Sequence, residues 1–94
     1  MRSVFCLIIL LLSACATKPP VQAMSDARSA IKTAQQLPGD MPKAAYYLKS
    51  AEQALSEAAQ AVKAERYEQA RVKAREARRN AQQAARIKQS TFNK

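Results

Sequence analysis

Alanine recurs at steps of three and four residues along most of the chain after residue 20, and this spacing constrains the fold most. Residues three and four apart lie on one face of an α-helix, so the recurring alanines would form a stripe. The residues between them are mainly Gln, Glu, Lys and Arg, which favour helix. The alternation of apolar and polar residues that is typical of a strand does not occur in this part of the sequence. The pattern predicts an all-α fold.

Three helices are expected, over about residues 21–36, 41–63 and 67–89. Their apolar stripes consist of Met24, Ala27, Ile31 and Ala34, then Leu48, Ala51, Leu55, Ala58 and Val62, then Tyr67, Ala70, Ala74, Ala77, Ala81 and Ala84. The last two stripes do not join in one register, because the five residues from Val62 to Tyr67 add about 140° of rotation. We therefore predict a turn near residues 64–66, with one long helix as the alternative, and either an antiparallel helical hairpin or a small three-helix bundle.

The segment between the first two helices carries residues that stop one helix and start the next. Pro38 cannot continue a helix, and Gly39 tolerates the left-handed conformation in which many helices end. Asp40 is expected to be the N-cap of the second helix, and Pro42 is tolerated in its first turn.

Residues 1–14 have the pattern of a cleaved secretory signal. Arg2 gives a positive start, and residues 4–12 form an apolar run that is too short to span a bilayer, which needs about 20 residues. Residues 15–20 are expected to form a linker, because the paired prolines at its end favour extended backbone. The helical domain would then occupy residues 21–94.

The end of the apolar run, Leu12-Ser13-Ala14-Cys15, resembles the bacterial lipobox. The resemblance implies cleavage before Cys15 and acyl chains, such as palmitate, on its sulfur and amine. Two or three such chains are enough for stable anchoring. In lipoprotein sorting an aspartate after the cysteine favours the inner membrane, so Ala16 implies the periplasmic face of the outer membrane. An ordinary signal peptide followed by a chance cysteine is the alternative.

The chain is strongly basic, with a formal net charge of +9. Arg2 is the only charged side chain in the predicted signal, so nearly all of this charge belongs to the rest of the chain. Its partners are therefore expected to be acidic: anionic lipid headgroups, cell-wall polymers or acidic protein surfaces. Nucleic acid is not expected as a partner of an exported lipoprotein. Five arginines fall between about 80° and 180° from Ala70 on a helical wheel, namely Arg71, Arg75, Arg78, Arg79 and Arg86. They are candidates for binding an anionic partner, and a solvated face that keeps the protein soluble is the alternative.

No catalytic constellation is visible in the sequence. There is no histidine, the one cysteine of the mature chain would carry lipid, and a single glycine cannot build a phosphate loop. The few acidic residues show no spacing typical of metal ligands. We expect a chain that is not an enzyme and has no metal or cofactor besides the lipid on Cys15.

Lys94 is the last residue. The major cell-wall-linked lipoprotein of Gram-negative bacteria is also short, helical and acylated, and it is joined to peptidoglycan through its C-terminal lysine. This chain is similar to it in plan, although Ser90-Thr91-Phe92-Asn93 stands where that protein has aromatic and basic residues. The similarity makes Lys94 a candidate wall link.

A closer resemblance is to DUF4398, a family of small helical envelope proteins and lipoproteins. It spans roughly residues 24–87 and rests on the Ala-rich first helix, on Leu48-x-x-Ala51-x-x-Ala54-Leu55 and on Glu65-Arg66-Tyr67-Glu68-Gln69-Ala70-Arg71. Family members often have Gly-Asp or Gly-Asn before the tyrosine, where this chain has Glu65-Arg66. The resemblance implies a helical hairpin in the cell envelope without a known activity.

These features favour a membrane-anchored, non-catalytic helical module with an interaction or structural role. Three roles stay open: a hairpin whose stripe accepts a partner helix, a peptidoglycan-associated spacer, and a binder of anionic lipid surfaces. Because alanines contribute little hydrophobic stabilisation, self-association or an envelope protein partner is also expected.

Overall fold

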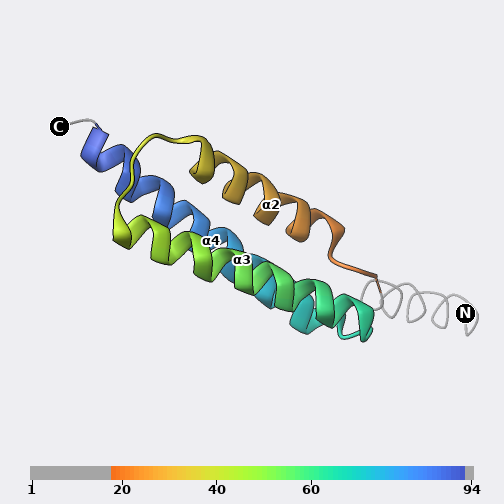
Figure 1. Ribbon diagram of the computed structural model, residues 1–94. Coiled ribbons are helices and arrows are strands. Elements are labelled where there is room, and N and C mark those ends of the chain that lie inside the picture. Colours follow the sequence, from red (N-terminus) through yellow and green to blue (C-terminus); the bar gives the residue numbers. More distant parts are fainter. Residues whose placement is uncertain (1–17, 93–94) are drawn as a thin grey trace, which may run out of the picture.

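The computed structural model describes residues 18–92, which form three helices: α2 (Val21–Gln36), α3 (Pro42–Lys63) and α4 (Tyr67–Phe92). The all-α class is confirmed, and of the two expected arrangements the chain adopts the three-helix bundle (Figure 1). α3 runs antiparallel to α2 and α4, so the α3–α4 turn lies at the same end of the bundle as residues 18–20. The predicted signal, lipobox and Lys94 lie outside the described residues.

The core is a column of four layers, each with one buried side chain from every helix. The layers are Met24, Ala58 and Ala74; Ala27, Ala54 and Ala77; Ile31, Ala51 and Ala81; and Ala34, Ala44 and Ala84. All but two of these side chains are alanine. Protein interiors are close-packed, so layers of methyl groups require the three helices to approach closely. The small size of the core residues therefore sets the spacing of the bundle.

α3 buries a different edge of its apolar face from the one expected. Its buried residues are Ala44, Ala51, Ala54, Ala58 and Ala61, whereas Leu48, Leu55 and Val62 are only half-buried. Leu55 covers three of the four layers from the side. In all four layers the side chain that α3 contributes is an alanine methyl group, so the larger side chains of α3 lie at the flank of the column.

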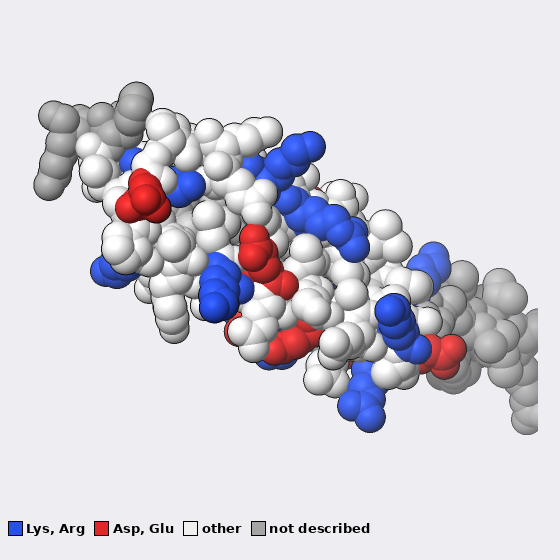
Figure 2. All heavy atoms as spheres, viewed as in Figure 1, with Lys and Arg blue, Asp and Glu red and all other residues white. Residues whose placement is uncertain are grey.

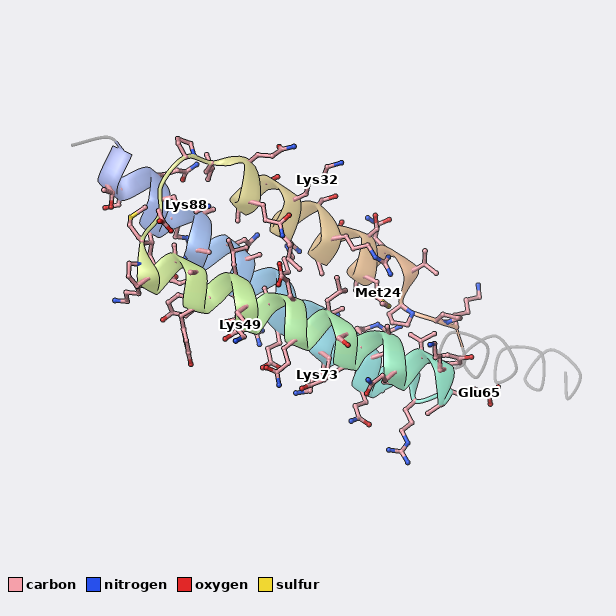
Figure 3. The ribbon with its side chains drawn as sticks, viewed as in Figure 1. Met24, Lys32, Lys49, Glu65, Lys73 and Lys88 are labelled. Carbon is pink, nitrogen blue, oxygen red and sulfur yellow. The ribbon has the colours of Figure 1, made fainter. Side chains whose placement is uncertain are left out.

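α2 ends without a glycine cap. Leu37 is extended, with φ −70° and ψ 139°, because a residue that precedes a proline disfavours the helical conformation. The end of α2 is instead capped by Lys88 of α4, whose Nζ donates hydrogen bonds to the carbonyl oxygens of Ala34 at 2.8 Å and Leu37 at 3.2 Å (Figure 3). A cation is favourable here because the last carbonyls of a helix lack partners and carry its negative dipole end.

The start of α3 differs from the expectation. The N-cap is Met41, in extended conformation and with no side-chain cap hydrogen bond, so the predicted N-cap role of Asp40 is wrong. The helix begins one residue too late for the Asp40 side chain to occupy the cap position. Pro42 lies in the first turn as expected. Gly39 has φ +125° and lies within the loop, not at the end of α2.

The turn between α3 and α4 falls at residues 64–66, as predicted. The N–H of Arg66 donates to the carbonyl of Ala61 at 2.8 Å, and the N–H of Glu65 donates to that of Val62 at 3.0 Å. These two bonds define a Schellman motif, in which one residue takes the left-handed conformation. Glu65 holds that position, with φ +60°. Glycine would serve this conformation without a steric penalty.

Replacing Glu65 by glycine is expected to raise the free energy of unfolding by about 0.5–1 kcal/mol. Glycine removes the cost of holding an L-residue at positive φ, and part of that gain is offset by a more flexible unfolded chain. Urea denaturation of the two proteins measures the difference. Ala64→Gly is the control, because Ala64 has φ −86° and glycine there should lower stability. Equal effects of the two substitutions would contradict the conformational explanation.

Candidate functional site

Three of the five candidate arginines line one hollow between α2 and α4. Arg71, Arg75 and Arg78 follow each other at helical spacing on α4, and the facing wall consists of Gln22, Ala23 and Asp26 from the first two turns of α2. The hollow has a volume of about 310 Å³. We call it the arginine groove. It lies in the half of the bundle where the described chain begins.

The charges of the arginine groove are only partly paired. Arg71 Nη1 donates to Glu68 Oε2 at 2.8 Å, and the Arg71 side chain is 27% exposed. Within residues 18–92, Arg75 and Arg78 have no acidic oxygen within 4.0 Å. The Asp26 carboxylate accepts a hydrogen bond from Gln22 Nε2 at 2.9 Å. Two exposed, unpaired guanidinium groups remain, and their planar donor forks suit a phosphate or a carboxylate.

The other two candidate arginines are separate from this groove. Arg79 and Arg86 are exposed, and neither lines the hollow. Arg86 Nη1 donates to Gln83 Oε1 of its own helix at 3.3 Å. The predicted stripe is therefore divided into a groove of three arginines and two arginines outside it. The candidate residues Leu12, Ser13, Ala14, Cys15 and Lys94 lie outside the described residues.

An ion-pair cluster that the sequence pattern does not mark joins α3 to α4. Lys73 Nζ lies 2.9 Å from Glu57 Oε2 across the two helices and 3.2 Å from Glu76 Oε2 on its own helix (Figure 3). The hydrogen bond from Lys73, together with its positive charge, lowers the pKa of Glu57 below the ordinary value of 4.5. Hydrogen bonds to Glu57 and Glu76, and their negative charges, raise the pKa of Lys73 above 10.5. The Glu57–Lys73 pair links α3 to α4, and the cluster of one lysine and two glutamates keeps a net charge of −1.

These pKa shifts predict how stability depends on pH. A lowered carboxyl pKa stabilises the fold above about pH 4.5, and this contribution is lost as the pH falls through the lowered value. A raised lysine pKa stabilises the fold below about pH 10.5, and this contribution is lost as the pH rises through the raised value. Because both side chains are partly exposed, at 40% for Glu57 and 32% for Lys73, solvent screens the pair and the effect is small.

Glu57→Gln is therefore expected to have a slightly lower melting temperature than the wild type at pH 7, and a smaller difference at about pH 3, because the contribution of Glu57 is lost as the pH falls through its lowered pKa. Thermal unfolding followed by circular dichroism at the two pH values measures this. Glu52→Gln is the control, because Glu52 forms no ion pair among the described residues and only accepts a hydrogen bond from Gln35. A difference for Glu57→Gln that is equally large at the acidic pH would contradict the ion-pair explanation.

Two further findings concern the described part of the chain. No group of three or more His, Cys, Asp or Glu side chains in residues 18–92 is arranged to hold a metal ion. None of the three helices combines the length and the apolar character needed to cross a membrane.

Residues 22–91 match a family model described as a domain of unknown function, DUF4398. The chain belongs to the DUF4398 family. The match starts at the second residue of α2 and ends one residue before the end of α4, so the DUF4398 domain is the whole three-helix bundle. The predicted membership is thereby confirmed, and the bundle replaces the hairpin that the resemblance implied. No curated protein and no solved structure matches the chain.

Proposed function

We propose that this DUF4398 protein is a lipid-anchored, non-catalytic helical module of the bacterial cell envelope that engages anionic groups through the arginine groove. The observation that carries this proposal is the pair of exposed arginines, Arg75 and Arg78, which face α2 without an acidic partner among the described residues.

The position of the groove in the chain supports its use at a membrane surface. Gln22 on the groove wall follows Cys15 by seven residues, and an extended chain spans at most about 3.6 Å per residue. If Cys15 carries lipid, the groove is held within about 25 Å of the bilayer. Anionic headgroups and wall polymers both lie in that zone, and juxtamembrane basic residues gain about 1 kcal/mol each near an anionic surface.

The anchor and the groove are tested in one expression system. Cells grown with labelled palmitate are expected to label the wild-type protein, whereas Cys15→Ala should stay unlabelled and accumulate with its signal attached. If Cys15→Ala is processed to the same size as the wild type, the lipoprotein assignment is wrong. Inner- and outer-membrane fractions of the same cells, run on the same gels, measure whether the protein is in the outer membrane.

The groove is tested with the unacylated chain of residues 16–94 and phosphatidylglycerol vesicles in a sedimentation assay. Arg75→Gln/Arg78→Gln is expected to weaken binding about ten-fold, and high salt should abolish binding of the wild type. Arg79→Gln/Arg86→Gln removes the same charge outside the groove and is expected to weaken binding much less. Equal losses for the two double variants would show that net charge acts alone and would contradict a groove.

A further inference from the structure

The junction of α2 and α3 is the open side of the bundle. α2 packs mainly on α4 and touches α3 less, and two hollows of about 520 and 300 Å³ lie between α2 and α3. Both hollows are lined by Arg28, so they adjoin. Together they form one groove, here the α2/α3 groove, which follows α2 from Val21 to Gln35. About 15 residues of helix correspond to about 22 Å, or four turns. Figure 2 views this face of the molecule.

The floor of the α2/α3 groove is apolar. It includes Ile31 and Met24 from α2, and the half-buried Leu55, Ala59 and Val62 from α3. At one end the apolar side chain of Val21 is 71% exposed. Leu55 and Val62 are larger apolar residues of α3 that lie at the flank of the alanine column. Their exposed parts would be removed from water by another apolar helix.

The rim of the groove is basic. Arg28 and Lys32 stand on the α2 side and Lys63 on the α3 side, and none of them has an acidic oxygen within 4.0 Å in residues 18–92. The one carboxylate on the rim, Glu52, already accepts a hydrogen bond from Gln35 Nε2 at 2.9 Å. Blue side chains extend along the α2 edge of this face in Figure 2. The groove therefore favours negative flanking charges on its occupant.

We propose that the α2/α3 groove binds one amphipathic helix of another protein, which is apolar on the side facing the groove and acidic along both flanks. A length of four turns and an apolar floor fit the helix-in-groove mode of recognition. A second copy of this chain is a poor occupant, because its net charge of +9 would meet a basic rim. The site involves neither the arginine groove nor the lipid anchor, so it goes beyond the proposed function and can fail independently of it.

The test uses the mature protein isolated from cells and held in phosphatidylcholine nanodiscs, whose neutral surface does not attract an acidic peptide. The probe is a fluorescein-labelled helical peptide of about 16 residues, with leucines along one face and glutamates on the flanks. A second peptide has lysines in place of the glutamates. Fluorescence anisotropy is expected to show that the glutamate peptide binds at least about ten-fold more tightly than the lysine peptide.

Two pairs of variants at exposed positions locate the binding. Arg28→Glu/Lys32→Glu is expected to reverse the preference between the peptides, whereas Arg79→Glu/Arg86→Glu, which changes the net charge equally, should keep it. Val21→Ser should weaken binding of the glutamate peptide about three-fold, whereas Val72→Ser, at the half-exposed Val72 of α4, should not. Circular dichroism checks that each variant keeps its helix content. The proposal is overturned if the two peptides bind alike, if neither binds, or if the control variants behave like the groove variants.

Discussion

Replacing Ala77 by leucine is expected to lower the free energy of unfolding by about 3 kcal/mol or more. Ala77 is fully buried in a layer whose other two members, Ala27 and Ala54, are also alanine. Three helix backbones meet there around three methyl groups, so the added carbons of leucine have no space. They can be accommodated only if the helices separate, and separation would expose the neighbouring layers as well. Urea denaturation followed at 222 nm measures the loss.

The control is Ala45→Leu, because Ala45 is exposed on α3 and leucine also favours helix. This substitution is expected to change stability by less than about 0.5 kcal/mol. An Ala77→Leu protein as stable as Ala45→Leu would mean that the alanine column is looser than its buried areas indicate. Since an alanine at each layer contributes little hydrophobic energy, the prediction tests whether close approach of the helices is what specifies the bundle.

Replacing Lys88 by methionine is expected to cost about 2–3 kcal/mol and to loosen α2 selectively. Lys88 is 7% exposed, and its ammonium group is the only capping partner found for the carbonyls of Ala34 and Leu37 among the described residues. Methionine keeps a similar apolar stem, but it leaves two carbonyls and the end of the α2 dipole without a donor. The energy lost is therefore that of the cap and not of the packing.

Two measurements distinguish this cap from a general effect. Lys49→Met, which removes an exposed lysine from α3, should leave stability nearly unchanged. Amide hydrogen exchange of Lys88→Met should accelerate in α2 more than in α3 and α4, because only α2 loses a partner. Uniform acceleration in all three helices would indicate that Lys88 supports the whole core instead of the end of α2.

The helices could be predicted because they depend on local residues. Alanine spacing fixes the buried face of α2, where all four expected residues, Met24, Ala27, Ile31 and Ala34, are buried. Pro38 stops α2 through a steric clash that involves only its neighbours. The apolar stripes of α3 and α4 do not share one register, so the chain must turn between them, and it does so at residues 64–66.

The arginine groove could be predicted only in part. The helical wheel places five arginines on one side of the α4 alanines, and this depends on α4 alone. A helical wheel of α4 cannot predict which of these arginines lie beside α2. α2 meets Arg71, Arg75 and Arg78 near its own start, and Arg79 and Arg86 stay outside the hollow. Gln22 and Asp26 could not be assigned to the site from sequence, because their neighbours are more than 40 residues away along the chain.

By itself, therefore, the sequence determined the helical class, the approximate limits of the helices and the buried face of α2. The tertiary structure alone decided which side chains occupy the centre. On α3 it selected alanines over Leu48, Leu55 and Val62, since the close approach of the three helices leaves room only for a methyl group from α3. It also decided the role of Lys88, which continues the α4 stripe and caps the end of α2 at Leu37, 51 residues earlier in the chain. The buried charge is tolerated there because carbonyl oxygens accept hydrogen bonds from it.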